Sequence, residues 1–380
     1  MAFVVEWFDK LASIDKPFRL IYYPYDHSIE IIDVKTKRQT LKRIKYEQIS
    51  PGDLYIGNSL DIYGRRYKIV DYADQSTKEQ LFARKERTFA LIKPDAYPHI
   101  GKIIDIVIAN GFQVNRAQML KLNEEMIQML FADQAGRPHF KEFSKFMLSD
   151  VVVGLEIVGE NSIERMNIIA GPDSPNVAKE GTERDRMSIR AVFGTDLTKN
   201  AIHVSRDEMC YRREVEIFFN ERFLRDVTCQ TAVLNNCSLC IIKPHSVQSG
   251  LTGKIIDRIL EEGFEVSALQ SFFLDRFIAE DFFELYKGVL PDFNLMIDQM
   301  VSGPCLAMEV RQDNVVPSFK NLCGAFDPKI GASKGERDTL RQLYGIDRAR
   351  NAVHCTDMPE EGVLECEYFF VLMQERKVPF

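Results

Sequence analysis

Cysteine is missing from the first 209 residues of this 380-residue chain, and six of its eight cysteines lie in the last 145. A secreted disulfide framework does not cluster its cysteines in this way, so we expect a reduced, intracellular protein. The sequence also lacks any run of eighteen apolar residues, so no transmembrane helix is expected. Its first ten residues, MAFVVEWFDK, have neither the basic flank nor the apolar length of a signal peptide.

Basic residues are fewer than acidic ones, 49 Lys and Arg against 56 Asp and Glu. The formal net charge of −7 argues against a general nucleic-acid binder, and a charged content of 28% argues against a membrane protein. One segment departs from this balance, because KTKRQTLKRIK at 35–45 holds six basic residues and no acid. It is either a solvated hairpin or a docking patch for an acidic surface. Its basic residues are Lys35, Lys37, Arg38, Lys42, Arg43 and Lys45.

A long repeat occupies most of the chain. RTFALIKPDAYPHIGKIIDIVIANGFQV at 87–114 is matched by CSLCIIKPHSVQSGLTGKIIDRILEEGFEV at 237–266. SDVVVGLEI and SGPCLAMEV follow, then IIAGPDSP and NLCGAFDP, then SIRAVFGTD and TLRQLYGID. NAIHVS at 200–205 and NAVHCT at 351–356 come next, and REVEIFF and LECEYFF end the series. The unbroken order excludes chance and indicates a duplicated domain.

Each copy has the periodicities of a small α/β unit. FALI at 89–92 predicts a short strand ended by Pro94, and GKIIDIVIA predicts a helix with one apolar face. FQVNRAQMLKL and VVVGLEIV are typical of strands, ERMNIIAG of a helix, and EVEIFF predicts a closing strand. The order β-α-β-β-α-β predicts a ferredoxin-like fold of the α/β (α+β) class, built twice in tandem.

We expect four segments along the chain. FRLIYYPYDHSIEIIDV alternates apolar and polar residues around turn signals, so residues 1–86 are expected to form a small, mostly-β domain. The first copy of the repeat spans 87–220, a linker without strong periodicity spans 221–236, and the second copy spans 237–380.

The repeated histidine is a candidate nucleophile. A neutral imidazole near pH 7 can hold a phosphoryl group covalently. The reaction needs cations against the polyphosphate charge and a carboxylate that orients the ring. Each copy supplies these residue types in the same order, which favours a reactive histidine over a structural one. The candidates are His203 and His354, with carboxylates Glu214 and Glu365, hydroxyls Ser205 and Thr356, cations Lys93, Lys243, Arg190 and Arg341, and amides Asn200 and Asn351.

Both copies resemble nucleoside diphosphate kinase domains. The resemblance rests on LIKPD, GKII…GF, SIRAVFG…KNAIHVS and the glutamate before IFF, and it covers roughly residues 87–220 and 237–373. It implies ping-pong transfer of a γ-phosphate from ATP or GTP to a nucleoside diphosphate, through phosphohistidine and with Mg²⁺ on the phosphates. It also implies that the asparagines bond the ribose 3′-hydroxyl. Domains of this family assemble as dimers within hexamers, so the two copies are expected to pair through the first helix and second strand.

Both copies depart from the family pattern at the nucleotide site. In the first copy the phosphate-binding arginine falls on Asn167, and the phosphate-side threonine on Asp173. A carboxylate ~4 Å from a phosphate charge would repel it by about 4 kcal/mol at an effective dielectric of 20. The tyrosine and the base-stacking phenylalanine fall on Phe131 and His139. In the second copy the corresponding residues are Lys320, Phe326, Phe283 and, near the stacking position, Phe293. We expect nucleotide binding in at least one copy, turnover well below that of a dedicated enzyme, and the better site in the second copy.

A β domain before two kinase domains is also the arrangement of a ciliary member of this family. Residues 1–86 resemble the module that this member shares with EF-hand doublet-microtubule proteins, through phrases such as YYPYDHSIEI. The resemblance implies a cytoskeletal microtubule inner protein in the axoneme of cilia. Its partners would be tubulin, which is acidic, and other doublet-microtubule proteins. We favour a microtubule-bound scaffold with residual phosphotransfer. The alternatives are a fully active kinase on microtubules and a regulator that binds nucleotide without turnover.

CSLC at 237–240 is a weak metal or redox motif. No second CxxC accompanies it, and residues three apart in a strand point to opposite faces, so core packing is the better interpretation. The chain has no Gly-rich phosphate loop, and the kinase family does not use one.

Overall fold

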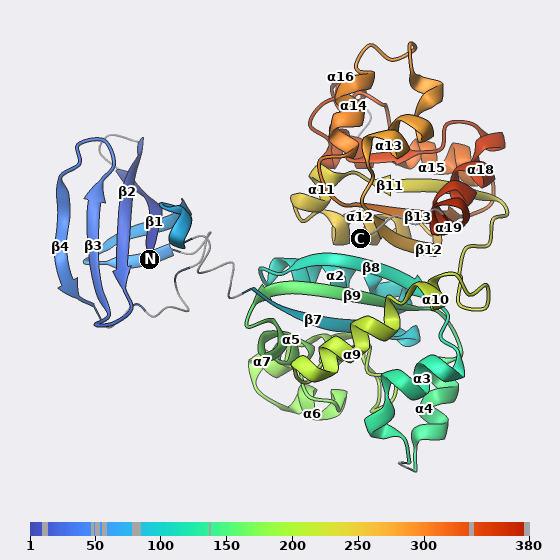
Figure 1. Cartoon of the computed structure of the whole chain (residues 1–380), viewed down its shortest axis with the longest axis horizontal. Coiled ribbons are helices and arrows are strands. Elements are labelled where there is room, and N and C mark those ends of the chain that lie inside the picture. The colour runs from blue at the N-terminus through green and yellow to red at the C-terminus, as the bar shows by residue number, and fades with distance from the viewer. Residues whose placement is uncertain are drawn as a thin grey trace. The chain divides into compact units, whose positions relative to one another are not determined.

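The computed structural model describes residues 1–9, 14–46, 49, 54, 59–77, 85–136, 138–333 and 338–375. The chain divides into two compact units, Met1–Lys85 and Glu86–Phe380 (Figure 1). None of the described helices is long and apolar enough to cross a membrane.

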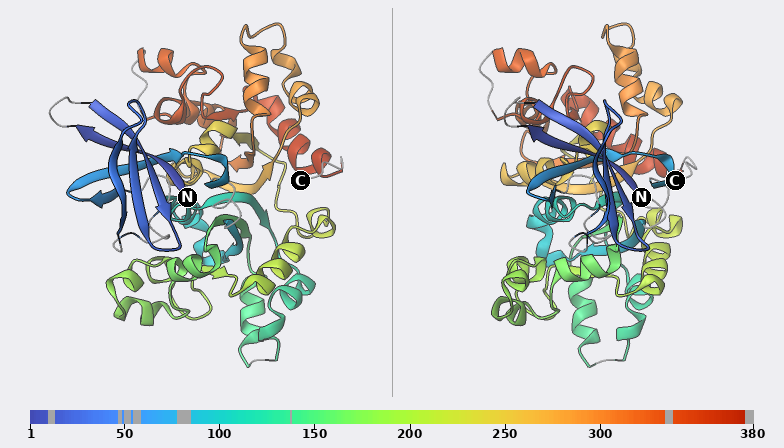
Figure 2. Two further views of the ribbon diagram at one scale, coloured as in Figure 1. Left: turned by 60° about the vertical axis from the view of Figure 1, so that its left-hand side comes forward. Right: turned by 90° about the vertical axis from the view of Figure 1, so that its left-hand side faces the viewer.

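The first unit is built on one antiparallel sheet with the order β4-β3-β2-β1-β6-β5, and its strands twist across the sheet (Figure 2). Alternate residues such as Phe3, Val5, Leu20 and Tyr22 are buried on one face and form its core. This confirms the predicted sheet-rich region. The strands are β1 (Ala2–Asp9), β2 (Ile14–Tyr23), β3 (Ser28–Asp33), β4 (Gln39–Lys45), β5 (Ser59–Ile62) and β6 (Arg65–Tyr72).

The basic segment at 35–45 forms the turn after β3 and the edge strand β4. All six of its basic side chains are exposed. Arg43 pairs with Asp26 at 2.8 Å and lies over the ring of Tyr23. Charged side chains on an edge strand also hinder pairing with a foreign strand, so exposure alone does not identify a docking patch.

The second unit contains both copies of the repeat. The first copy follows the order β-α-β-β-α-β, with short helices inserted between the main elements. Its elements are β7 (Lys85–Ile92), α2 (Ile100–Ala109), β8 (Gln113–Leu120), α3 (Glu124–Leu130), α4 (Phe140–Met147), β9 (Val152–Glu160), α5 (Ser162–Ala170), α6 (Pro175–Glu180), α7 (Glu183–Arg186), α8 (Ile189–Phe193), β10 (Ile202–Val204) and α9 (Glu208–Phe218). The segment after it contains α10 (Glu221–Leu224).

The second copy repeats this order. Its elements are β11 (Cys237–Ile242), α11 (Pro244–Gln248), α12 (Thr252–Glu261), β12 (Glu265–Phe272), α13 (Arg276–Phe282), α14 (Phe293–Met300), β13 (Cys305–Arg311), α15 (Val315–Cys323), α16 (Pro328–Ser333), α17 (Leu340–Tyr344), β14 (Val353–Cys355), α18 (Gly362–Glu367), a π-helical turn at Tyr368–Leu372 and α19 (Met373–Glu375). The predicted class, two ferredoxin-like units, is confirmed. In both copies Gly111 and Gly263 follow the first helix with φ near 80°, as helix-ending glycines do.

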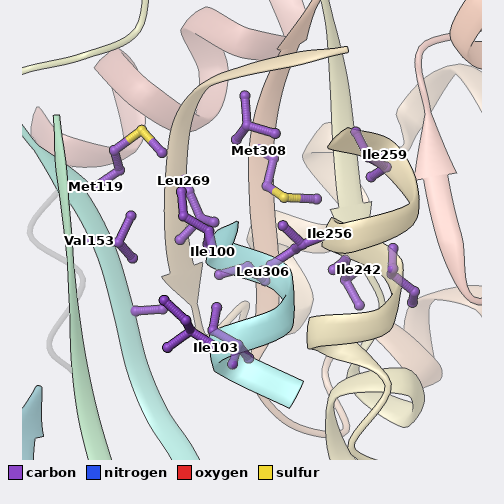
Figure 3. Close-up of a cluster of buried hydrophobic side chains, with 14 of the residues drawn as sticks. Ile100, Ile103, Met119, Val153, Ile242, Ile256, Ile259, Leu269, Leu306 and Met308 are labelled. Atoms are coloured by element: carbon purple, nitrogen blue, oxygen red, sulfur yellow. The ribbon is translucent and has the colours of Figure 1, made fainter. Parts of the chain in front are cut away.

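The two copies share one eight-stranded sheet with the mirrored order β10-β7-β9-β8-β12-β13-β11-β14. Strands β8 and β12 meet at its centre, where Gln118 lies opposite Gln270. Apolar side chains from both copies form one core, including Ile103 and Met119 from the first copy and Ile256 and Leu306 from the second (Figure 3). The expected pairing of the copies within the chain, through the first helix and second strand, is therefore present.

Two glycines allow the first helices of the copies to approach. A Cβ added at Gly101 of α2 would lie 2.3 Å from the backbone nitrogen of Asp257. A Cβ added at Gly253 of α12 would lie 2.4 Å from the backbone nitrogen of Asp105. Because real Cβ atoms never come so close to backbone, the glycine of each GKIID motif is required by the helix crossing.

The predicted closing strand EVEIFF is wrong, since these residues belong to helix α9. Asp207 caps the helix by accepting the backbone N–H of Cys210 at 2.8 Å. Cys210, Glu214 and Phe218 are buried at a spacing of four residues, which is a helical period. The last strand of the β-α-β-β-α-β order is instead β10, which carries the histidine.

Candidate functional site

Each histidine lies in the middle of a short strand at an edge of the shared sheet. His203 belongs to β10, which pairs with β7, and His354 belongs to β14, which pairs with β11. Two residues earlier, Ala201 and Ala352 both have φ of 69°. Their carbonyls accept the backbone N–H of the lysine that directly follows β7 or β11, at 2.8 and 2.9 Å. The same local turn therefore brings the IKP lysine beside the histidine strand in both copies.

In the first copy a glutamate on helix α9 orients the histidine. His203 Nε2 lies 3.0 Å from Glu214 Oε1. The Ser205 hydroxyl donates to Glu214 Oε2 at 2.5 Å, so the carboxylate is held by strand and helix together. The side chain of Glu214 is 3% exposed and that of His203 is 20% exposed. The three residues therefore form the predicted acid–imidazole–hydroxyl group.

The second copy builds the same group from a strand and helix α18. His354 Nε2 lies 3.2 and 3.3 Å from the two carboxylate oxygens of Glu365. The Thr356 hydroxyl donates to Glu365 Oε2 at 2.7 Å and accepts the backbone N–H of Leu239 at 2.9 Å. The His354 side chain is only 7% exposed, which makes this ring less accessible than its counterpart.

A phenylalanine packs edge-on against each imidazole. The ring centroids of Phe131 and His203 are 5.1 Å apart, and those of Phe283 and His354 are 5.3 Å apart. Both phenylalanines stand where the family has tyrosine, so they restrict the ring without offering a hydroxyl. Within the described residues, Nδ1 of neither histidine makes a hydrogen bond, whereas Nε2 of both is held by a carboxylate. Nδ1 is therefore the nitrogen left for nucleophilic attack.

The predicted phosphate cradle of the first copy is assembled. Lys93 is buried and donates to the Asn200 side-chain oxygen at 2.6 Å. Arg190 is also buried and donates to the Gly171 carbonyl at 2.6 Å. Its guanidinium also pairs with the carboxylate of Asp173 at 2.9 Å. The cradle is cationic, but one of its cations already faces an anion from the chain itself.

Burial perturbs both cradle lysines. Desolvation, followed by repulsion from Arg190, lowers the pKa of Lys93 to about 8. Desolvation and then Arg341 lower the pKa of Lys243 to about 7. The charge of each lysine therefore depends on pH near neutrality. An arriving polyphosphate would favour the protonated, cationic form.

In the second copy an aromatic ring occupies the middle of the cradle. The ring centroid of Phe326 lies 5.7 Å from the Arg341 guanidinium and 6.0 Å from the Lys243 ammonium. The Asn351 amide donates to the Phe326 carbonyl at 2.8 Å. Arg341 also donates to the Gly324 carbonyl at 2.9 Å. The cations are present, but they surround a side chain that cannot accept their hydrogen bonds.

The position of the family's second phosphate-binding arginine is also changed in both copies. Lys320 pairs with the carboxylate of Asp357 at 2.8 Å, and Asp357 accepts the Tyr286 hydroxyl at 2.6 Å. Asn167 donates to the backbone carbonyl of Ser205 at 2.8 Å. Neither side chain is free to act as the missing arginine would.

The stacking positions differ between the copies, and Phe293 must be reassigned. His139 is the cap of helix α4, and the residue in the same place before α14 is Asp292. Phe293 is the first residue of α14 and is buried in the core. Asp292 pairs with Arg348 at 3.3 Å beside a cleft of about 640 Å³. The one-residue insertion in the preceding loop caused the error in register.

Sequence reasoning missed Asp357, Asp292 and Arg348. Asp357 directly follows the histidine phrase, so its nearness to the site could have been inferred. The contact between Asp292 and Arg348 joins segments that are distant in sequence, and no local pattern signals it. An alignment of the two copies on their helices instead of their loops would have identified Asp292.

Comparison with known proteins finds similar sequences along most of the chain. The family model "Nucleoside diphosphate kinase" matches residues 86–223 and 236–374. The chain is 40% identical over 375 residues to "Nucleoside diphosphate kinase homolog 7" of Rattus norvegicus, and it is 40% identical to the protein of the same name from Mus musculus. Each alignment covers 98% of this chain and 93% of the relative. A crystal structure of the Aquifex aeolicus nucleoside diphosphate kinase is 36% identical and covers 36% of this chain and 96% of its own, with a TM-score of 0.34.

Proposed function

The chain belongs to the nucleoside diphosphate kinase family, and we propose that its two kinase-like domains bind nucleoside di- and triphosphates and retain weak phosphotransfer through phosphohistidine. The observation that carries this proposal is the pair of acid–imidazole groups. In each, a glutamate holds Nε2 and leaves Nδ1 without a hydrogen bond among the described residues, and a buried lysine follows the strand that pairs with the histidine strand.

The chemistry assigns one task to each residue. Nδ1 of His203 or His354 attacks the γ-phosphorus, and the bond from this phosphorus to the β–γ bridging oxygen breaks, so a nucleoside diphosphate leaves. The phosphoryl group then passes from the histidine to a second nucleoside diphosphate. The glutamate keeps the proton on Nε2 and stabilises the imidazolium. Lysine and arginine offset the phosphate charge, and the asparagine amide is the candidate partner of the ribose hydroxyl.

Mg²⁺ would arrive on the nucleotide. The cradle offers cations and, in the first copy, also carboxylates, among them Asp173, whose side chain is 83% exposed. Such a donor set suits a metal that the phosphates already hold better than a metal bound by the protein alone. When present, Mg²⁺ neutralises charge on the phosphate oxygens.

We infer that the first copy is the better of the two sites, which reverses the expectation from sequence. His354 is less exposed than His203, Phe326 occupies the second cradle, and Lys320 is held by Asp357. In the first copy the carboxylate that pairs with Arg190 is exposed, so an incoming phosphate can displace it. Both copies lack the tyrosine hydroxyl and the second arginine, so turnover is expected well below that of a complete site.

Labelling with γ-labelled ATP tests the phosphotransfer. Acid-labile, base-stable label is expected on the full chain, mostly lost in His203→Ala and slightly reduced in His354→Ala. Ser149→Ala, an exposed change outside both cradles, serves as the control. An unlabelled native chain would remove the kinase function. Turnover equal to that of single-domain enzymes of the family would favour the alternative, a fully active kinase.

We further propose that residues 1–85 attach the chain to tubulin inside ciliary doublet microtubules, together with other doublet proteins. The exposed cations of the turn and of edge strand β4 support this, because they face solvent without an acid in the same segment. An acidic protein surface is the complementary partner. The protein would then be located in the cytoskeleton of the axoneme, and its kinase-like domains would be attached there through residues 1–85.

Charge reversal tests the tubulin proposal. The full chain with Lys35, Lys37 and Lys42 changed to glutamate should lose most of its co-sedimentation with microtubules, and native binding should weaken with added salt. Lys141, Lys145 and Lys179 changed to glutamate give the same charge change in the second unit and should have little effect. Equal loss in both variants would show nonspecific attraction and contradict the assigned surface.

A further inference from the structure

Three side chains that the nucleotide site does not use meet inside the second copy. Cys237 begins β11, Glu309 lies in β13 and Cys366 lies in α18. Their exposed fractions are 3%, 0% and 0%. One sulfur or carboxylate oxygen from each lies within 4.8 Å of the others, and no other such group of potential metal ligands occurs among the described residues.

The first copy builds the same place differently. Glu156 there corresponds to Glu309, and it accepts hydrogen bonds from Arg87 at 3.3 Å and Arg116 at 2.9 Å. The repeat places Cys237 at the position of Arg87. Strand register places an alanine at the position of Arg116. Arg116 lies opposite Glu156 on the neighbouring strand of the first copy, and the alanine lies opposite Glu309 in the second. Two guanidinium groups are therefore absent from the second copy, and thiols surround its buried carboxylate.

Glu309 retains one unused acceptor position. Its Oε2 accepts the backbone N–H of Val233 at 2.7 Å and the hydroxyl of Ser267 at 2.6 Å. Among the described residues, its Oε1 accepts only the backbone N–H of Leu234 at 2.7 Å. A carboxylate offers about four such positions, so one position on Oε1 remains. No cation pairs with Glu309 in the described part of the chain, unlike its counterpart in the first copy.

We propose that Cys237, Cys366 and Glu309 bind a zinc ion. Thiolate and carboxylate are both zinc ligands, and soft sulfur excludes Mg²⁺, which requires oxygen ligands. The two thiols lose their protons to solvent as the ion binds. The two charges of the ion replace these protons, so the net charge of the buried cluster is unchanged. A small ligand such as water completes the four positions of a tetrahedral ion.

The ion joins the linker and the catalytic helix of the second copy. Glu309 already holds the backbone at residues 233 and 234, at the end of the linker. Cys366 directly follows Glu365, whose carboxylate meets His354. Zinc bound to Cys366 would therefore fix helix α18 and the orientation of this imidazole. Cys240, the other cysteine of the CSLC motif, is buried in the opposite core and takes no part.

Metal content tests the proposal directly. The full chain, produced with zinc in the medium and dialysed against metal-free buffer, should retain about one zinc per chain. Cys237→Ser and Cys366→Ser should each retain less than about a tenth of this, because two ligands seldom hold the ion. Cys229→Ser, which removes a buried thiol outside the cluster, is the matched control and should retain the native amount. Protein produced with cobalt alone should show thiolate-to-cobalt charge-transfer absorption, lost in the same two variants.

A second measurement covers variants that fail to fold. Treatment of the native chain with a strong chelator should release zinc and make two further thiols accessible to a thiol reagent, while zinc added back protects them. A native chain without zinc, equal zinc in all variants, or a Cys237–Cys366 disulfide detected by mass would each overturn the proposal. None of these readouts depends on phosphotransfer, so the proposal stands or fails apart from the kinase function.

Discussion

Replacing Asp173 by asparagine should strengthen nucleotide binding in the first copy. Asparagine keeps the size of the side chain and removes its charge. Arg190, which now pairs with Asp173 at 2.9 Å, would then be free to face a phosphate. The variant therefore tests the carboxylate that pairs with Arg190.

The expected gain follows from two effects. The ion pair with Arg190 is exposed on the aspartate side, 83% for Asp173, and such pairs contribute ~0.2–1 kcal/mol. Repulsion between the carboxylate and a phosphate ~4 Å away is about 1 kcal/mol in water-like surroundings. Together they amount to about 1–2 kcal/mol, which corresponds to roughly 5–30-fold in affinity.

The assay uses a His354→Ala background, in which only His203 can take label from γ-labelled ATP. The ATP concentration that gives half-maximal labelling should fall by roughly 5–30-fold in Asp173→Asn. Glu180→Gln makes the same charge change on an exposed residue of the same loop, at the end of α6, and should shift it less than about twofold. The gain should shrink as salt rises, because the charges involved are exposed.

Unchanged or weaker labelling in Asp173→Asn would refute this reasoning. Weaker labelling would show that the carboxylate assists the nucleotide, for instance through its Mg²⁺, and that the pair with Arg190 is a productive part of the site. A gain of equal size in Glu180→Gln would show that only the overall charge of the loop matters.

Three further changes test other parts of the structure. As pH rises, Lys243 with a pKa of about 7 and then Lys93 with a pKa of about 8 lose their positive charge. Nucleotide affinity should therefore fall above neutrality. Calorimetry at about pH 8 should detect proton uptake on nucleotide binding, and Lys243→Arg should reduce this uptake. Gly253→Val should destabilise the second unit by at least about 2 kcal/mol in denaturant unfolding, because its side chain meets the backbone of Asp105, whereas Lys254→Val on the exposed face should not. Phe326→Thr in a His203→Ala background should increase labelling at His354 by freeing the cations around the ring, and exposed Leu343→Thr should leave it unchanged.

The duplicated motifs predicted much of the site because they are short and rigidly spaced. Asparagine and histidine lie within one local turn, and the repeated order of the motifs associates the lysine with them, although Lys93 lies 107 residues before Asn200. The glutamate was predicted as a partner, but on a strand instead of a helix. EVEIFF contains enough β-branched and aromatic residues to suggest a strand, and only burial of Glu214 and Phe218 on one face selects the helix.

The sequence by itself determined the repeat, the two ferredoxin-like units, the candidate histidines and the departures at Asp173 and Phe326, because each depends on residues close in the chain or on internal comparison. Tertiary structure decided how the side chains were used. Asp173 faces Arg190, Asp357 holds Lys320, and Asp292 meets Arg348, through contacts that no periodicity encodes. The meeting of Cys237 with Cys366 is of the same kind, since 128 intervening residues must fold before the two thiols are neighbours.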